Sequence, residues 1–184
     1  FNSVDGLFKR YKHDPKNENS ISSDNIQSIY EDREGTLWIG TDRTGLNMFD
    51  AKNGTFKKYT YNVENPNSIS SNTINCICQD RSGILWIGTS GGLNAFNPNT
   101  QNFTCYTEQD ELPNNVIYSV IEDSKNNLWL STNNGICRFT PPRGENQPAV
   151  VKSYDAKDGL PGNEFNFGAY HKGKNGNLYY GGIK

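Results

Sequence analysis

Short apolar segments recur along this chain, each about five residues long and each followed by a polar or glycine-containing turn. Isoleucine opens the segments at residues 26–30, 74–78 and 117–121, and β-branched residues of this kind favour strands. No segment has apolar residues at the three- and four-residue spacing of an amphipathic helix. The pattern therefore predicts an all-β protein.

An aromatic phrase follows each apolar segment. It reads Leu-Trp-Ile-Gly-Thr at residues 37–41 and 85–89, Leu-Trp-Leu-Ser-Thr at 128–132 and Leu-Tyr-Tyr-Gly-Gly at 178–182. Its aromatic column is spaced 48, 43 and 50 residues apart and consists of Trp38, Trp86, Trp129 and Tyr179. A period in the forties that repeats one short strand-rich unit is typical of a β-propeller blade.

Each unit contains four predicted strands. A third strand begins at Gly45, Gly92 and Gly135, and a fourth covers residues 56–59, 103–106 and 150–154. A four-stranded antiparallel meander of this size matches a propeller blade. We predict a partial β-propeller of about three full blades plus two half blades. Its parts are the outer strands of a preceding blade and a linker at 1–19, blades at 20–67, 68–111 and 112–159, and the inner strands of a following, last blade at 160–184.

Both ends of the chain fall inside a unit. Residues 1–2 align with 49–50, and residues 8–11 align with 56–59. Either the two half blades pair into a closed four-bladed propeller, or the chain is a piece of a larger propeller. We favour the piece, because closure would lack most of one third strand. The exposed sheet edges of a piece recruit further strands, so a homo-oligomer through blade edges is expected.

Composition narrows the class of partner. The formal net charge is −2 and the charges are scattered, which argues against nucleic acid, because that partner requires a basic face. Apolar residues make up only 33% of the chain, which is low for one compact core but suits thin layers between blades. No apolar run approaches the 18 residues of a membrane span, so direct membrane insertion by this segment is not expected.

The four cysteines occupy different columns of the repeat, so none belongs to the repeating architecture. Cys76 and Cys78 alternate on one strand and could suggest zinc, but no second matched pair completes a zinc spacing. Free thiols buried on strands are the favoured interpretation. A disulfide between Cys105 and Cys137 remains an alternative.

Two columns of the repeat are interpreted as structural. They are the aspartates that open the turn before each aromatic strand and the tryptophans of those strands: Asp32, Asp80, Asp123, Trp38, Trp86 and Trp129. Aspartate caps such turns through its side chain, and each aspartate belongs to its own blade, which disfavours a shared metal or acid site. The tryptophans could stack on sugars, but their fixed place in an inner strand favours packing between blades.

A third column precedes each first strand: Asp24, Asn72, Asn115 and Asn163. Residues that enter the innermost strand face the rim of a propeller's central channel, where an amide can exchange paired hydrogen bonds with sugar hydroxyls. We predict ligand-binding roles for Asn72, Asn115 and Asn163, and for Asn166 and Tyr170 of the divergent last copy. The alternative for the column is a local Asx turn.

No catalytic constellation is visible. His13 and His171, the only histidines, occupy unrelated positions of the repeat, and no spacing supports a Ser/His/Asp or Cys/His arrangement. We therefore predict a non-catalytic segment that needs no cofactor and no metal.

The phrase Asp-Arg-x-Gly-x-Leu-Trp-Ile-Gly-Thr followed by Gly-Leu resembles the regulator-propeller repeat of bacterial hybrid two-component sensors, at residues 32–46, 80–93 and 123–136. Residues 158–166 resemble the last repeat before an immunoglobulin-like domain. The resemblance implies a periplasmic part of an inner-membrane protein, in which the remaining blades and that domain precede a membrane helix and a histidine kinase. It implies sensing of oligosaccharides or another small ligand. The alternatives are a self-closing propeller that serves as a protein-binding scaffold and, less favoured, a propeller lyase or glycan hydrolase.

Overall fold

The computed structural model describes residues 6–144 and 147–183. Three four-stranded antiparallel sheets follow one another along the chain, each with its strands in sequence order. The first contains β1 (Ile26–Glu31), β2 (Leu37–Thr41), β3 (Leu46–Asp50) and β4 (Thr55–Tyr59). The second contains β5 (Ile74–Gln79), β6 (Leu85–Thr89), β7 (Gly92–Asn97) and β8 (Asn102–Tyr106). The third contains β9 (Ile117–Glu122), β10 (Leu128–Thr132), β11 (Gly135–Thr140) and β12 (Val150–Tyr154).

A two-stranded sheet of β13 (Phe165–Lys172) and β14 (Leu178–Gly182) follows the third blade. Two short 3-10 turns, Glu108–Asp110 and Ala156–Asp158, lie in the loops that lead into β9 and β13. The predicted three full blades and the following half blade are therefore confirmed.

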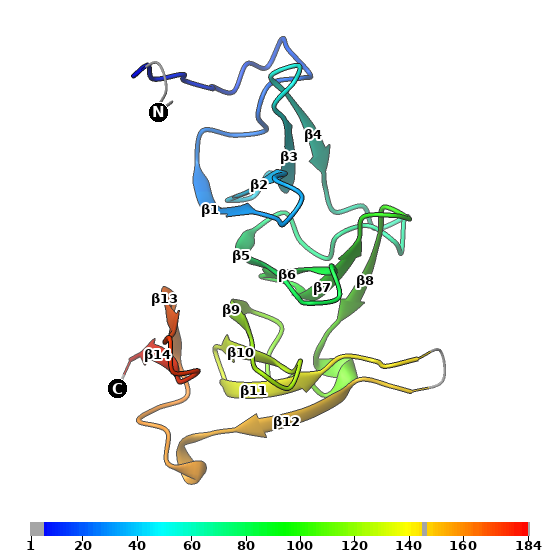
Figure 1. The fold of residues 1–184 in the computed structure, drawn as a ribbon. Coiled ribbons are helices and arrows are strands. Elements are labelled where there is room, and N and C mark those ends of the chain that lie inside the picture. The colour runs from blue at the N-terminus through cyan, green and yellow to red at the C-terminus, as the bar shows by residue number, and fades with distance from the viewer. Residues whose placement is uncertain (1–5, 145–146, 184) are drawn as a thin grey trace.

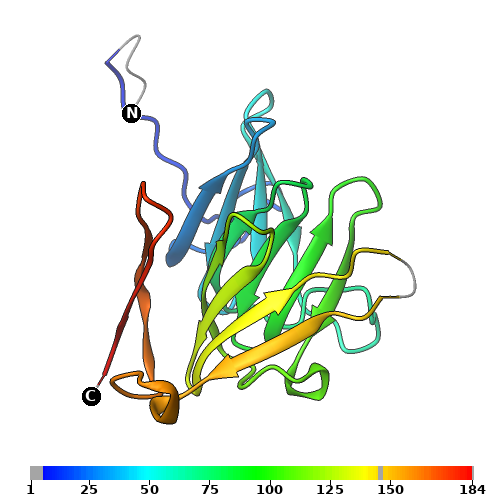
Figure 2. The ribbon, with the colours of Figure 1, turned by 60° about the horizontal axis from the view of Figure 1, so that its bottom comes forward.

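The blades stand side by side in an arc (Figure 1). Their first strands, β1, β5, β9 and β13, are neighbours on the inner side of the arc, and β4, β8 and β12 lie on the outer side. Figure 2 shows the same sheets turned, with the half blade beside the third blade. This arrangement is that of a partial β-propeller.

The turn between the first two strands of each blade follows from local chemistry. Gly35 and Gly83 have φ values of 79° and 91°, a region that favours glycine. In the third blade Asn126 takes the same role with φ 62°, because asparagine tolerates the left-handed conformation better than most side chains. Asn126 thus takes the place of the glycine, and the same hairpin forms in all three blades.

The apolar core lies between the blades. The Trp38 ring contacts Phe96 of the second blade edge to face, with ring centroids 5.3 Å apart. Trp86 contacts Phe139 of the third blade in the same way at 5.5 Å. The two larger clusters of buried residues each combine side chains of adjacent blades, so every blade is stabilised by its neighbour.

All four cysteines are free thiols, so Cys105 and Cys137 form no disulfide. Cys76 and Cys137 are buried, whereas Cys78 and Cys105 are partly buried. Burial raises the pKa of Cys137 to about 12 and that of Cys78 to about 11, which keeps both thiols protonated and unreactive at neutral pH.

The strand expected at residues 8–11 does not form, because no strand of the described residues lies beside this segment to pair with it. The Tyr11 ring nevertheless packs on Phe49 and Phe56, with centroids 4.9 and 5.6 Å apart. Tyr59 packs on Phe96 and Phe103 in the next blade, so Tyr11 occupies its repeat position without the strand. The aligned residues 1–2 lie outside the described residues.

No helix within residues 6–144 and 147–183 is long and apolar enough to cross a membrane.

Candidate ligand-binding site

The asparagine column lies at one rim of the arc. Each member stands two residues before an inner strand: Asp24 before β1, Asn72 before β5, Asn115 before β9 and Asn163 before β13. These residues are partly buried except for Asp24, which is exposed. The repeat therefore places one carboxylate and three amides at equivalent points of four successive blades.

The side-chain oxygen of each column member accepts a main-chain N–H from the loop that precedes it. The donors are His13 for Asp24 (2.8 Å), Tyr61 for Asn72 (2.8 Å), Glu108 for Asn115 (2.8 Å) and Ala156 for Asn163 (2.9 Å). The donor stands seven or eleven residues earlier, so the contact closes a long loop and is not a local Asx turn.

The main chain of the column also joins neighbouring blades. The carbonyl of Asn72 accepts the Gly45 N–H at 2.8 Å, and the carbonyl of Asn163 accepts the Gly135 N–H at 2.6 Å. The amide Nδ2 of Asn163 donates to Asn134 Oδ1 at 3.5 Å. Among the described residues Nδ2 of Asn72 and of Asn115 has no partner, so these two N–H donors are what the column can offer a ligand.

A groove of about 430 Å³ lies at the other ends of the inner strands, lined by residues 29–30, 77–79, 120–122 and 170–172. Tyr170 belongs to this groove, and burial and the nearby thiols of Cys76 and Cys78 raise the pKa of its hydroxyl, so it remains a neutral donor. Asn166 is exposed on β13. The structure thus separates Tyr170 from the asparagine column by the length of the inner strands, roughly 20 Å for six residues.

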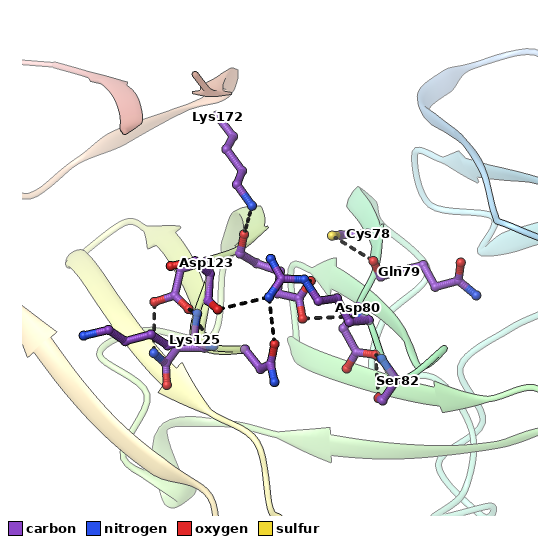
Figure 3. A network of polar contacts seen from close by, with 12 residues as sticks. Cys78, Gln79, Asp80, Ser82, Asp123, Lys125 and Lys172 are labelled. Atoms are coloured by element: carbon purple, nitrogen blue, oxygen red, sulfur yellow. Dashed lines mark hydrogen bonds and ion pairs between the residues drawn. The ribbon is translucent and has the colours of Figure 1, made fainter. Parts of the chain in front are cut away.

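Figure 3 shows a polar network that includes Gln79 and Lys172, two residues that line this groove. Gln79 reaches the preceding blade, where its Oε1 accepts the Arg33 N–H at 3.0 Å and its Nε2 donates to Glu34 at 3.1 Å. Lys172 of the half blade donates from Nζ to the main-chain oxygen of Glu122 (Figure 3). The residue that ends one inner strand therefore ties its blade to the turn or strand end of the blade before it.

Arg81 continues the network toward the third blade. Its main-chain N–H donates to Glu122 at 3.2 Å, and its guanidinium donates to Ser124 and Asn126 at 3.1 and 3.0 Å. Because these donors are satisfied by the next blade, the arginine is engaged in the fold and is not a free anion-binding group.

The aspartate and tryptophan columns form one repeated unit. Oδ2 of the aspartate accepts the indole Nε1–H of its tryptophan, at 2.8 Å for Asp32–Trp38, 2.7 Å for Asp80–Trp86 and 3.0 Å for Asp123–Trp129. Oδ1 accepts main-chain N–H groups of the turn, such as Thr36 on Asp32 at 2.7 Å. Burial opposes the ionisation of Asp123, but hydrogen bonds from Asn127, Trp129 and the turn outweigh it and lower its pKa to about 2.

The sequence analysis did not single out two buried asparagine side chains that hydrogen-bond to the main chain within their own blades. Asn47 and Asn94 are fully buried on β3 and β7. Oδ1 of each accepts a main-chain N–H, from Ser22 and Ser70 respectively, both at 2.9 Å. The sequence feature that could have indicated these residues is the asparagine that follows Gly-Leu in two of the three copies of the repeat.

The described residues hold no group of three or more His, Cys, Asp or Glu side chains placed to bind a metal ion. The aspartates of the turns belong to separate blades, and Oδ2 of each already accepts a hydrogen bond from the tryptophan of its own blade.

The fold defines the class: a partial all-β propeller built of repeated four-stranded blades, with the first strand of each blade on the inner side of the arc. The family model described as "Two component regulator propeller" matches residues 20–43, 68–91 and 111–134, one match in each full blade. Each of the three full blades therefore contains one stretch that matches a two-component regulator propeller repeat. No curated protein matches the chain.

Among solved structures, the chain is similar to the extracellular domain of BT3049 from B. thetaiotaomicron, a protein assigned as a hybrid two component system. The identity is 27% and the TM-score 0.79, over 96% of this chain and 23% of that one. The corresponding domain of BT4673 from the same organism is 24% identical with a TM-score of 0.68, over 85% of this chain and 22% of that one, and supports the fold alone.

The fold is also shared with an enzyme. Virginiamycin B lyase from Staphylococcus aureus is 15% identical with a TM-score of 0.58, over 86% of this chain and 49% of that one. The present chain spans about a quarter of the length of the two-component domains it matches.

Proposed function

We propose that this chain is a ligand-sensing propeller segment from the periplasmic part of a hybrid two-component sensor. The observation that carries the proposal is the regulator-propeller match in all three full blades, together with 27% identity to the extracellular domain of BT3049 over nearly the whole chain. The segment is non-catalytic in this proposal. Its partners are the remaining blades, an immunoglobulin-like domain of the parent chain and a second copy that pairs through blade edges.

The ligand in this proposal is an oligosaccharide or another hydroxyl-rich small molecule. Nδ2 of Asn72 and Nδ2 of Asn115 are N–H donors at one rim, and their side-chain oxygens are already held by the loops. Asn163, Asn166 and Tyr170 of the half blade supply further polar groups. Ligand contact across adjacent blades would favour one domain arrangement and shift the population of the downstream histidine kinase between its states.

The test uses the intact ectodomain and a panel of glycan fragments in calorimetry. Asn72→Asp and Asn115→Asp retain the oxygen that holds the loop and remove the Nδ2–H donor, as Asp24 does naturally in the first blade. Each substitution is expected to weaken binding about 2- to 10-fold, the contribution of one hydrogen bond. Asp24→Asn is the matched control, which adds a donor and removes none.

Two binding results would contradict the proposed ligand site. Unchanged affinity in the Asn72→Asp/Asn115→Asp double variant would remove the rim site, and failure of every glycan fragment to bind would remove the carbohydrate ligand. Conversion of a glycan into products would instead favour the enzymatic alternative. An antibody to this segment should detect a membrane-fraction polypeptide several times larger than the chain, whereas a soluble polypeptide of the chain's own size would contradict the sensor.

A further inference from the structure

The repeat position of the outer strand carries a lysine–tyrosine pair in three of its four copies, including residues 8–11, which form no strand. The lysine ammonium lies over the tyrosine ring in the pairs Lys9–Tyr11, Lys57–Tyr59 and Lys152–Tyr154, at 5.0, 5.1 and 5.1 Å from the ring centroid. In the second blade the tyrosine is Tyr106, but Thr104 stands where the lysine is elsewhere. Within the described residues no ammonium covers the Tyr106 ring.

A second side chain is shortened beside the same ring. Ala95 pairs with Thr104 across β7 and β8, at the position where Met48 pairs with Lys57 and Arg138 pairs with Lys152. The second blade thus has two short side chains in adjacent strands where the other blades have two long ones. Ala95, Thr104 and the Tyr106 ring all line the same groove.

This ring borders a groove of about 440 Å³ between the second and third blades. Trp86, Tyr106, Pro141 and Pro142 supply apolar walls. The equivalent groove between the first and second blades has the same volume, but there Lys57 donates from Nζ to Gln101 Oε1, whose side chain lines that groove. The two grooves therefore have about the same volume, but only the first has a lysine hydrogen-bonded to its lining.

The charged side chain in the lining of the groove is an acid, while Arg81 and Arg143 line the adjoining groove that shares Asp80. The lining of the groove beside Tyr106 includes the carboxylate of Asp80 and no lysine, arginine or histidine. Burial raises the pKa of Tyr106, and the nearby negative charge of Asp110 raises it further, so the Tyr106 hydroxyl stays neutral at neutral pH. An aromatic face near a carboxylate attracts an ammonium by its quadrupole and by simple charge.

We propose that the groove between the second and third blades binds an aliphatic primary ammonium. The bound ammonium lies over the Tyr106 ring, as the ammonium groups of Lys57 and Lys152 lie over Tyr59 and Tyr154. The ammonium belongs either to a free alkylamine or to a lysine side chain of a polypeptide. This site is separate from the rim asparagines and does not depend on the proposed sensing of a glycan.

Saturation-transfer NMR on the intact protein tests the proposal, because it detects weak ligands whatever the size of the receptor. The probes are Nα-acetyl-lysine methylamide, its neutral isostere Nα-acetyl-norleucine methylamide, n-butylamine and methyl glucoside. We expect transfer to the ε-methylene of the lysine probe and about 3- to 30-fold weaker binding of the norleucine probe. Binding of n-butylamine as well points to a free amine, whereas binding of the lysine probe alone points to a polypeptide.

Matched variants place the site. Thr104→Lys supplies the missing ammonium from the chain itself and should abolish transfer to the lysine probe, whereas Thr104→Val keeps the side chain short and should leave it intact. Lys57→Thr should create a second site at Tyr59. Equal binding of lysine and norleucine probes, binding that survives Thr104→Lys, or binding of methyl glucoside alone that Thr104→Lys removes would each overturn the proposal.

Discussion

At the scale of single residues, the third blade replaces a polar contact by an apolar one. Asn47 is held by Ser22, whose main-chain N–H reaches its Oδ1 at 2.9 Å and whose Oγ accepts its Nδ2–H at 2.8 Å. Asn94 and Ser70 repeat the contact in the second blade at the same distances. A buried amide is tolerated at this position because both of its ends are satisfied.

In the third blade the serine is replaced by Pro113 and the asparagine by Cys137. Proline has no N–H to donate, so an asparagine opposite it would be buried without a partner for its oxygen. Cys137 is fully buried and needs no such partner. The two substitutions, 24 residues apart in sequence, are therefore explained by one contact.

Cys137→Asn is expected to lower the free energy of unfolding by about 1–3 kcal/mol, because it buries an unsatisfied amide. The same substitution in a Pro113→Ser background should cost clearly less. Urea denaturation of the four variants of this cycle measures the difference. Cys137→Ala serves as a control for the loss of the thiol, and an equal cost of Cys137→Asn in both backgrounds would show that the two positions are not coupled.

At the scale of elements, the aromatic strand is stabilised by the next blade. Trp86 is 2% exposed, contacts Phe139 of the third blade and donates its Nε1–H to Asp80. Trp129 stacks on Tyr154 of its own blade at 5.6 Å but is only partly buried, since the described half blade has no strand that supplies the equivalent phenylalanine. The same residue type therefore has two different environments.

In the 184-residue chain, Trp86→Ala is expected to cost about 3–5 kcal/mol as a core truncation, and Trp129→Ala clearly less. Thermal or urea unfolding of both variants measures this order. Wild-type stability of Trp86→Ala would refute the packing role, and equal costs would show that contact with the next blade contributes little.

At the scale of the whole molecule, successive blades are joined by the residue that ends each inner strand. Gln79, 7% exposed, donates to and accepts from the turn of the first blade. Glu122 in the third blade accepts the Arg81 N–H from the turn of the second. Glu31 holds the same repeat position in the first blade but makes no such contact within the described residues. In a repeat protein such nearest-neighbour contacts supply much of the stability.

Gln79→Ala is expected to lower the free energy of unfolding by about 1–2 kcal/mol through the loss of these hydrogen bonds. Glu31→Ala is the matched control and should lie within about 0.5 kcal/mol of wild type, as for an ordinary surface change. Denaturant midpoints compare the two variants. A cost for Glu31→Ala as large as that for Gln79→Ala would show that the position matters for its own strand and not for the joint between blades.

The sequence by itself determined the features that depend on local chemistry. The aromatic phrase, the turns opened by Asp32 and Asp80 and the left-handed turn at Asn126 each involve residues within about six positions of one another. Alternation and turn residues therefore predicted the strands of the three full blades to within a residue or two. The thiols of Cys76 and Cys137 were likewise expected in the interior because they lie on apolar strands.

Only the tertiary structure decided which distant groups meet. It showed that the oxygens of Asn72 and Asn115 are held by loops, that Asn47 depends on Ser22, and that Tyr170 lies far from the rim asparagines. It also gave residues 8–11 no strand, because a strand requires a partner ladder that strand propensity alone does not supply. Hydrogen bonds and packing between blades join residues about 25 to 50 positions apart. The sequence pattern within one unit therefore does not predict which distant residue each side chain contacts.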